Sequence, residues 1–234
     1  VCSSDLAGLS AAFNAPLAGI MFALEEVHKN FSTSALVSVM CASLTGDFLS
    51  RQIFGLSPSL HFTLEISLPL NQYAWLLVLG VVTGLLGVFY NKMTIASLKL
   101  YDRIPVLKSY QKIIIPLFVS GVLGLWLPQV IGGGHVLVNY LNSEQLVLST
   151  LVVLLIVKFV FSLLSFGSGA PGGIFFPLLI LGSLIGAIFG QIAMIFGIAD
   201  VYFVNFVIFA MAGFFAGIVR APITGIVLIA EMCG

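Results

Sequence analysis

Residues 167–177 read Gly-Ser-Gly-Ala-Pro-Gly-Gly-Ile-Phe-Phe-Pro and carry no charged side chain. The stretch lies between two long apolar segments, 146–166 and 175–196, and continues into the second. Glycines let the backbone turn tightly and approach an ion closely, and a helix start has N–H groups without intrahelical acceptors. Those donors and the helix dipole both favour negative charge. The stretch therefore predicts an anion site, with a tight turn between packed helices as the alternative.

The composition places this stretch in a membrane. Of the 234 residues, 60% are hydrophobic and 8% are charged, whereas a soluble domain carries about 25% charged residues. Apolar segments recur, several of them near the ~20 residues that cross a bilayer. They cover residues 6–15, 16–26, 34–54, 71–104, 111–126, 146–166, 175–196, 204–219 and 222–233, with a short helix expected at 135–141. We therefore predict an all-α polytopic membrane protein without a second domain.

Several other classes of function are not supported by the sequence. The net charge is zero, which gives no reason to expect a nucleic-acid partner. No Ser-His-Asp or Cys-His pattern indicates an enzyme, and Gly132–Gly134 lacks the context of a nucleotide loop. The cysteines and histidines show no disulfide or metal-ligand spacing, so no metal or cofactor is expected; they are Cys2, Cys41, Cys233, His28, His61 and His135.

Two short segments match each other. The sequence from Ala15 to Glu25 aligns with that from Ala221 to Glu231 at a constant offset of 206 residues, with proline, glycine and glutamate in register. Segments 16–26 and 222–233 would rise only ~16–18 Å as helices, too little to span a bilayer. Each begins with proline, which suits the first helical turn. Paired short segments of this kind point to the binding region of a transporter, and we predict an internal repeat.

Three stretches resemble the CLC family of chloride channels and transporters, in its bacterial form. Residues 167–177 resemble the family motif Gly-Ser-Gly-x-Pro-Gly-Gly-x-Phe-x-Pro, and residues 11–26 and 220–231 resemble two further regions in the correct order. The resemblance covers residues 7–233, about the middle half of the family's membrane domain. It implies a homodimer with one anion path per subunit, and an inverted repeat with half-spanning helices and broken helix ends at the anion site.

The resemblance also assigns roles to residues of the loop. The backbone amides of Ile174 and Phe175 would hold the anion, within a loop that includes Gly167, Ser168, Gly169, Pro171, Gly172, Gly173 and Pro177. Phe176 stands where some members carry a small residue, so we expect it to narrow the site.

Three ionisable residues are further candidates. Glu26 resembles the internal proton-transfer glutamate of the family's exchangers, and its repeat counterpart is Met232; the alternative is a solvated acid at a helix end. Lys158 lies within an apolar segment, where an ionisable side chain suggests function; it either adds positive potential to the anion route or pairs with a carboxylate or helix carbonyls. Arg220 precedes a helix start, and we expect it at a water-filled vestibule of the anion route. Glu25 and Glu231 are expected to be structural, near the repeat or dimer interface.

Basic residues predict the orientation. Lys99, Arg103, Lys108 and Lys112 gather around one connection, which the positive-inside rule places in the cytoplasm. Glu26 then lies towards the cytoplasm of a bacterial plasma membrane, while Arg51 on the outer side runs against the rule.

We therefore expect transport of chloride or a similar small anion across the lipid bilayer, in exchange for protons. A passive channel of the same fold and a non-transporting piece stay open as alternatives. Residues 1–6 resemble a sequencing-adapter translation and are expected to be a non-native leader. Residues 7–234 then form a partial membrane domain, without the family's gating glutamate, serine-bearing loop and pore tyrosine.

Overall fold

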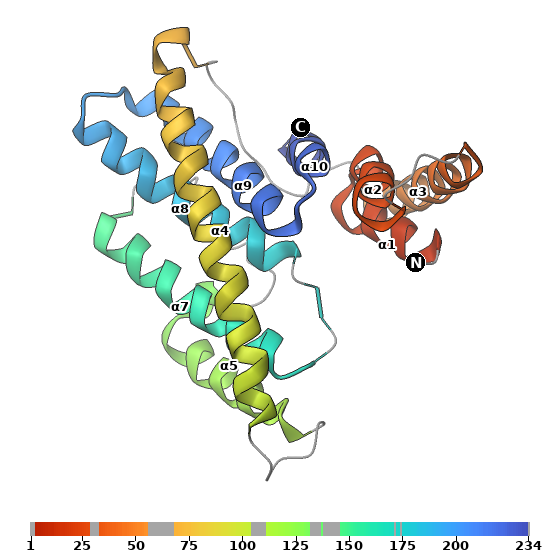
Figure 1. Ribbon diagram of the computed structural model, residues 1–234, viewed down its shortest axis with the longest axis horizontal. Helices are drawn as coiled ribbons and strands as arrows, with labels where there is room; N and C mark the ends of the chain where they lie inside the picture. Colours follow the sequence, from red (N-terminus) through yellow and green to blue (C-terminus); the bar gives the residue numbers. More distant parts are fainter. Residues whose placement is uncertain are drawn as a thin grey trace. The chain divides into compact units, whose positions relative to one another are not determined.

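The computed structural model is helical throughout its described part, which covers residues 3–28, 33–55, 68–103, 111–131, 137, 146–170, 172–173 and 175–233. It divides into two compact units. Unit 1 comprises residues 1–64 and 215–234, and unit 2 comprises residues 65–214. Figure 1 shows the helices of each unit, coloured along the sequence.

Unit 1 packs the N-terminal helices with the C-terminal one. Its elements are α1 (Ser3–Phe13), α2 (Pro16–Phe22), a π-helix (Ala23–His28), α3 (Thr33–Phe54) and α10 (Pro222–Cys233). Helix α1 lies along α3, and α10 packs against α2. The contact of α1 with α3 is close, because a Cβ at Gly46 would lie 2.7 Å from the Ala7 carbonyl oxygen. A small apolar core forms around Leu6, Ile20 and Val39.

Unit 2 is built around one deeply buried helix. Its long helices are α4 (Tyr73–Asp102), α5 (Ile114–Trp126), α7 (Leu148–Gly167), α8 (Phe175–Ile195) and α9 (Phe203–Val219), the last turn of which belongs to unit 1. Single 3-10 turns lie at Leu70–Gln72, Pro128–Val130 and Asp200–Tyr202. Helix α7 packs against α4 and α8, as Figure 1 also shows. In α8, 72% of the most apolar window is buried, against 22% for α4.

Five described helices are long and apolar enough to cross a membrane: Thr33–Phe54, Leu70–Asp102, Leu148–Gly167, Phe175–Ile195 and Asp200–Val219. The chain is therefore an integral membrane protein, and the prediction of an all-α polytopic fold is confirmed. Helices α5 and α10 are apolar but shorter. The segments expected from hydropathy agree with the observed helices to about three residues at each end, and segment 16–26 covers α2 together with most of the π-helix that follows it. Of the expected helix at 135–141, only Leu137 lies within the described residues.

Close contact between α8 and α9 depends on glycines of α8. A Cβ at Gly182 would lie 2.7 Å from the Met211 Cα, and one at Gly186 would lie 2.6 Å from the Phe206 carbonyl oxygen. Glycine therefore lets the backbones of α8 and α9 approach each other directly. In α4, the helical spacing of Gly80, Gly84 and Gly87 also predicts close helix packing. For Gly80 and Gly84 this prediction is wrong, because within the described residues no neighbouring atom comes within 4 Å of a Cβ at either position. Gly87, in contrast, is buried.

Candidate functional site

The loop after α7 is a tight turn stabilised by its own serine. The hydroxyl of Ser168 donates to the Ser165 carbonyl oxygen at 2.7 Å and accepts from the Ala170 N–H at 3.3 Å. Gly169 follows in the left-handed region, with φ of 74°, which glycine adopts without a steric penalty. Two of the predicted loop residues thus have clear local roles in ending α7 and turning the chain.

The turn leads to the start of α8. Gly172 and Gly173 are exposed, and the helix begins at Phe175, which is half-buried together with Phe176 and Pro177. The N–H groups of a first helical turn point back along the axis, here towards the glycines. Pro171 and Ile174, both expected in the anion site, lie outside the described residues.

The start of the loop is braced by α4. A Cβ at Gly167 would lie 2.1 Å from the Ser97 hydroxyl and 2.9 Å from the Tyr101 ring, so only glycine fits there. The Ser97 hydroxyl donates to the Leu163 carbonyl oxygen at 2.8 Å. About two turns earlier in α4, the hydroxyls of Tyr90 and Ser162 share a buried hydrogen bond of 2.8 Å. The end of α7, and with it the first loop residue, is fixed by these contacts.

Lys158 is buried inside α7, only 2% exposed. Its ammonium group donates to the Val130 carbonyl oxygen at 2.7 Å, at the end of the 3-10 turn Pro128–Val130. This contact is a pairing with a backbone carbonyl, one of the two alternatives considered for this lysine. It connects the turn after α5 to the helix that leads to the loop.

In unit 1, two glutamates cap each other's helices. The Glu25 carboxylate accepts the N–H groups of Ile223 and Thr224 at the start of α10, at 3.2 and 2.8 Å. The Glu231 carboxylate of α10 accepts the N–H groups of Leu17 and Ala18 at the start of α2, at 3.1 and 2.8 Å. Each carboxylate accepts from N–H groups that have no acceptor within their own helix. Its negative charge also interacts favourably with the positive end of the helix dipole. The structural role expected for both residues is thus observed as a reciprocal contact.

The turns that precede these two helices share a rare backbone conformation. Asn14, before α2, has φ of 52°, and Arg220, before α10, has φ of 62°. Among the described residues these are the two non-glycine positions with positive φ, and they are separated by the same 206 residues that relate Glu25 to Glu231. Arg220 is exposed. The left-handed turn gives this predicted site residue a conformational role.

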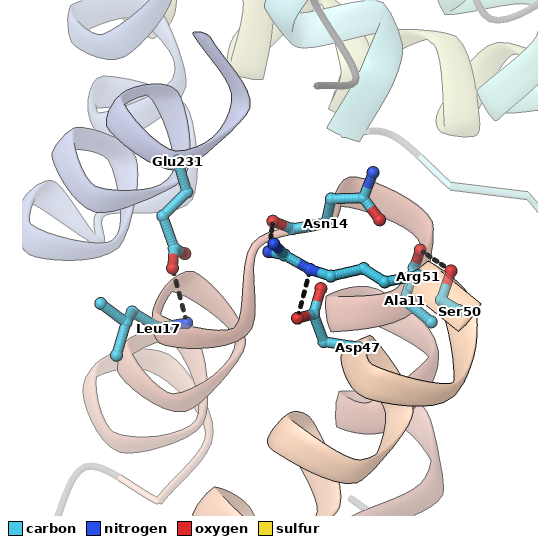
Figure 2. A network of polar contacts seen from close by, with 7 residues as sticks. All are labelled: Ala11, Asn14, Leu17, Asp47, Ser50, Arg51 and Glu231. Atoms are coloured by element: carbon cyan, nitrogen blue, oxygen red, sulfur yellow. Dashed lines mark hydrogen bonds and ion pairs between the residues drawn. The ribbon is translucent and has the colours of Figure 1, made fainter. Parts of the chain in front are cut away.

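The Asn14 turn has an added brace from α3. The Arg51 guanidinium donates to the Asn14 carbonyl oxygen at 3.1 Å and pairs with Asp47 at 2.6 Å. The Ser50 hydroxyl donates to the Ala11 carbonyl oxygen at 3.0 Å. Figure 2 shows the Arg51 side chain lying between Asp47 and Asn14, while the Glu231 carboxylate points to Leu17. The pairing with Asp47 also explains how the charged Arg51 is tolerated in an apolar helix, although its expected outer position runs against the positive-inside rule.

Glu26 lies in the π-helix that continues α2 and is half-buried. Such helices are rare, and they occur frequently at functional sites. The Asp47–Arg51 network and the reciprocal caps were not expected from the sequence. The spacing of Asp47, Arg51 and Ser43 on one face of α3 was the available signal, since two of these residues carry charge within an apolar helix.

Comparisons with known proteins agree on one family. The sequence profile described as "Voltage gated chloride channel" matches residues 6–234. The chain is 38% identical to the H(+)/Cl(-) exchange transporter ClcA of Vibrio parahaemolyticus, over 99% of this chain and 51% of that protein. It is 36% identical to ClcA of Klebsiella pneumoniae, over 96% and 49%. The chain thus spans about half the length of the curated relatives it matches.

Solved structures give the same answer for the fold. The crystal structure of a slow cyanobacterial Cl−/H+ antiporter superposes with a TM-score of 0.89 at 31% identity, covering 97% of this chain and 54% of that one. A CLC-type fluoride/proton antiporter superposes with a TM-score of 0.80 at 24% identity, over 98% and 56%. The described chain therefore belongs to the CLC family, whose members are membrane transport proteins and not enzymes.

Proposed function

We propose that the complete protein exchanges chloride or a similar small anion for protons across a bacterial plasma membrane. The observation that carries the proposal is the loop between α7 and α8, which a serine and a positive-φ glycine turn towards a helix start. Relatives described as H(+)/Cl(-) exchange transporters support the choice of exchange over passive conduction. The proposal applies to the whole protein that contains this chain.

In this proposal the anion is held by backbone amides. The N–H groups of Ile174 and Phe175 bind it, and Gly172 and Gly173 allow it to come close because they carry no side chain. Phe176 narrows the site from the first turn of α8. Lys158 adds positive potential to the route while its ammonium group stays bonded to Val130, and Arg220 contributes at an exposed turn.

The two short helices are proposed to form an inverted repeat. Three observations of unit 1 share the same offset of 206 residues: the matching sequences, the left-handed turns at Asn14 and Arg220, and the exchanged caps of Glu25 and Glu231. A two-fold relation between α2 and α10 accounts for all three at once, since each partner then makes the same contact. We infer that both helices are half-spanning, and that the subunits form homodimers.

Protons are proposed to enter through Glu26 from the cytoplasm. The carboxylate lies on a π-turn at the end of a short helix, where a proton can be taken up and passed on. The orientation rests on the basic residues around the connection from Lys99 to Lys112. Arg51, which is paired with Asp47, is the basic residue that runs against this orientation.

Reversal potentials of the complete protein in liposomes test exchange directly. Under a proton gradient at equal chloride, exchange shifts the reversal potential, whereas a passive channel gives no shift. Glu26→Gln should abolish the shift and keep the anion flux, and Asp102→Asn, which changes an exposed carboxylate, should leave both unchanged. A Glu26→Gln protein with full proton coupling would refute the role of Glu26.

The anion site has an independent test. Crystals of the complete protein soaked in bromide should give an anomalous peak beside the amides of Ile174 and Phe175. A peak confined to other positions would overturn this assignment, whatever the reversal potentials show.

A further inference from the structure

We propose that Glu25 is a positioning residue for proton transfer: by holding the π-turn against the start of α10, it fixes the direction in which Glu26 points. This inference rests on the proposed role of Glu26. It assigns a transport function to a helix cap that would otherwise contribute to stability alone.

The first step is that Glu25 is held in a single pose. Its Oε1 accepts the Ile223 N–H at 3.2 Å, and its Oε2 accepts both the N–H and the hydroxyl of Thr224, each at 2.8 Å. Three donors from two consecutive residues of another helix fix the carboxylate in position and in rotation. Hydrogen bonds to an ionised acceptor are also about twice as strong as neutral ones.

The second step is that this pose extends to the neighbouring residue. Glu25 and Glu26 are consecutive in the π-helix Ala23–His28, and consecutive residues share a planar peptide bond with only two soft dihedrals per residue. Ala23 and Leu24 of the same turn are buried in the core of unit 1. The turn is therefore held from the core on one side and from α10 on the other. The Glu25 side chain points to α10, and because consecutive side chains of a helix point in different directions, that of Glu26 points elsewhere around the helix axis.

The third step is an asymmetry in the repeat. Glu231 caps α2 with the same chemistry, yet it is followed by Met232, which is fully buried. Two equivalent caps are thus present, and only one stands beside a second carboxylate. If capping were the sole task of both glutamates, their replacement would have the same consequences for transport.

The chemistry of the cap suggests the right substitution. In Glu25→Gln an NH₂ group replaces one oxygen, so the side chain can no longer accept from Ile223 and Thr224 together. The volume and the helix stay the same, but the pose becomes loose. Glu231→Gln makes the identical change on the other helix. There the start of α2 keeps the Arg51 contact to Asn14 and the bond from the Ala15 N–H to the Ser10 carbonyl oxygen.

The experiment measures the proton flux and the chloride flux of the complete protein in liposomes. The quantity compared between variants is the number of protons moved per anion. We expect Glu25→Gln to lower this ratio below the wild-type value, with the anion flux retained. Glu231→Gln should keep the wild-type ratio, although both variants should unfold at lower temperature. Thr224→Val, which removes one of the three donors, should lower the ratio in the same direction and by less.

Each outcome decides the question. Equal ratios in wild type and Glu25→Gln would overturn the inference, and so would an equal fall in Glu25→Gln and Glu231→Gln, which would indicate general loosening. If Glu25→Gln fails to fold, Thr224→Val takes its place under the same criteria. The Glu26→Gln variant is measured alongside: if it retains coupling, the proposed function fails, whereas its loss of coupling beside an unaffected Glu25→Gln rejects this inference alone.

Discussion

The contact of α8 with α9 can be tested by adding a single methyl group at Gly186. In Gly186→Ala, the new Cβ would lie 2.6 Å from both the Phe206 carbonyl oxygen and the Val207 Cα, and 2.9 Å from the Ala210 Cβ. Non-bonded carbon atoms prefer about 3.5–4.0 Å, so the two helices would have to separate by about 1 Å. The two nearest atoms belong to the backbone and cannot move away by a rotamer change.

The size of the effect follows from two opposing terms. Overpacking of a filled interior costs about 1–3 kcal/mol, and backbone clashes place Gly186→Ala near the upper end. Alanine in place of glycine favours the helix by about 1 kcal/mol. The net loss is about 2 kcal/mol, which lowers the ratio of folded to unfolded protein by about thirtyfold.

The assay is thermal or denaturant unfolding of the complete protein in detergent. The matched control is Gly84→Ala in α4, where a Cβ meets no neighbouring atom within 4 Å, and which should be neutral or slightly more stable. Equal stability of the two variants would refute the close approach of α8 and α9. A more stable Gly186→Ala would refute it as well.

Three further predictions concern two polar contacts and one left-handed turn, and each is measured by unfolding in detergent. Arg51→Met leaves the buried Asp47 carboxylate without its cation and should cost about 2 kcal/mol, and adding Asp47→Asn should recover most of the loss; no recovery would contradict the ion pair. Asn14→Gly should be tolerated and Asn14→Val should cost about 1–2 kcal/mol, because only a residue suited to positive φ fits the turn; equal stabilities would contradict the left-handed conformation. Tyr90→Phe removes the buried bond to Ser162 and should cost about 1 kcal/mol, whereas a purely additive double mutant with Ser162→Ala would show that the two hydroxyls do not interact.

Much of the secondary structure could be predicted, because in a membrane the apolar length sets the helices. Pro16 and Pro222 placed the starts of α2 and α10, and both helices begin at these prolines. The boundary between α7, which ends at Gly167, and α8, which begins at Phe175, was visible as a run of glycines without charge. Such signals are local, so they survive without knowledge of the tertiary structure.

Contacts between distant segments were harder to predict. Glu25 and Glu231 could be matched by sequence, but their exchange of caps depends on how α2 and α10 pack, at a separation of about 200 residues. The glycine spacing of α4 resembled that of α8, and only the packing distinguishes an exposed face from a contact face.

The reciprocal caps also have a consequence for the order of assembly during synthesis. The acceptor for the Ala18 N–H is 213 residues further along the chain, so at about 5–20 residues per second the ribosome supplies it roughly 10–40 s after α2 has emerged. Arg51 arrives far earlier, only 37 residues after Asn14. We therefore expect α3 to hold the nascent α2 turn in place first, and the two short helices to complete each other only when α10 enters the membrane.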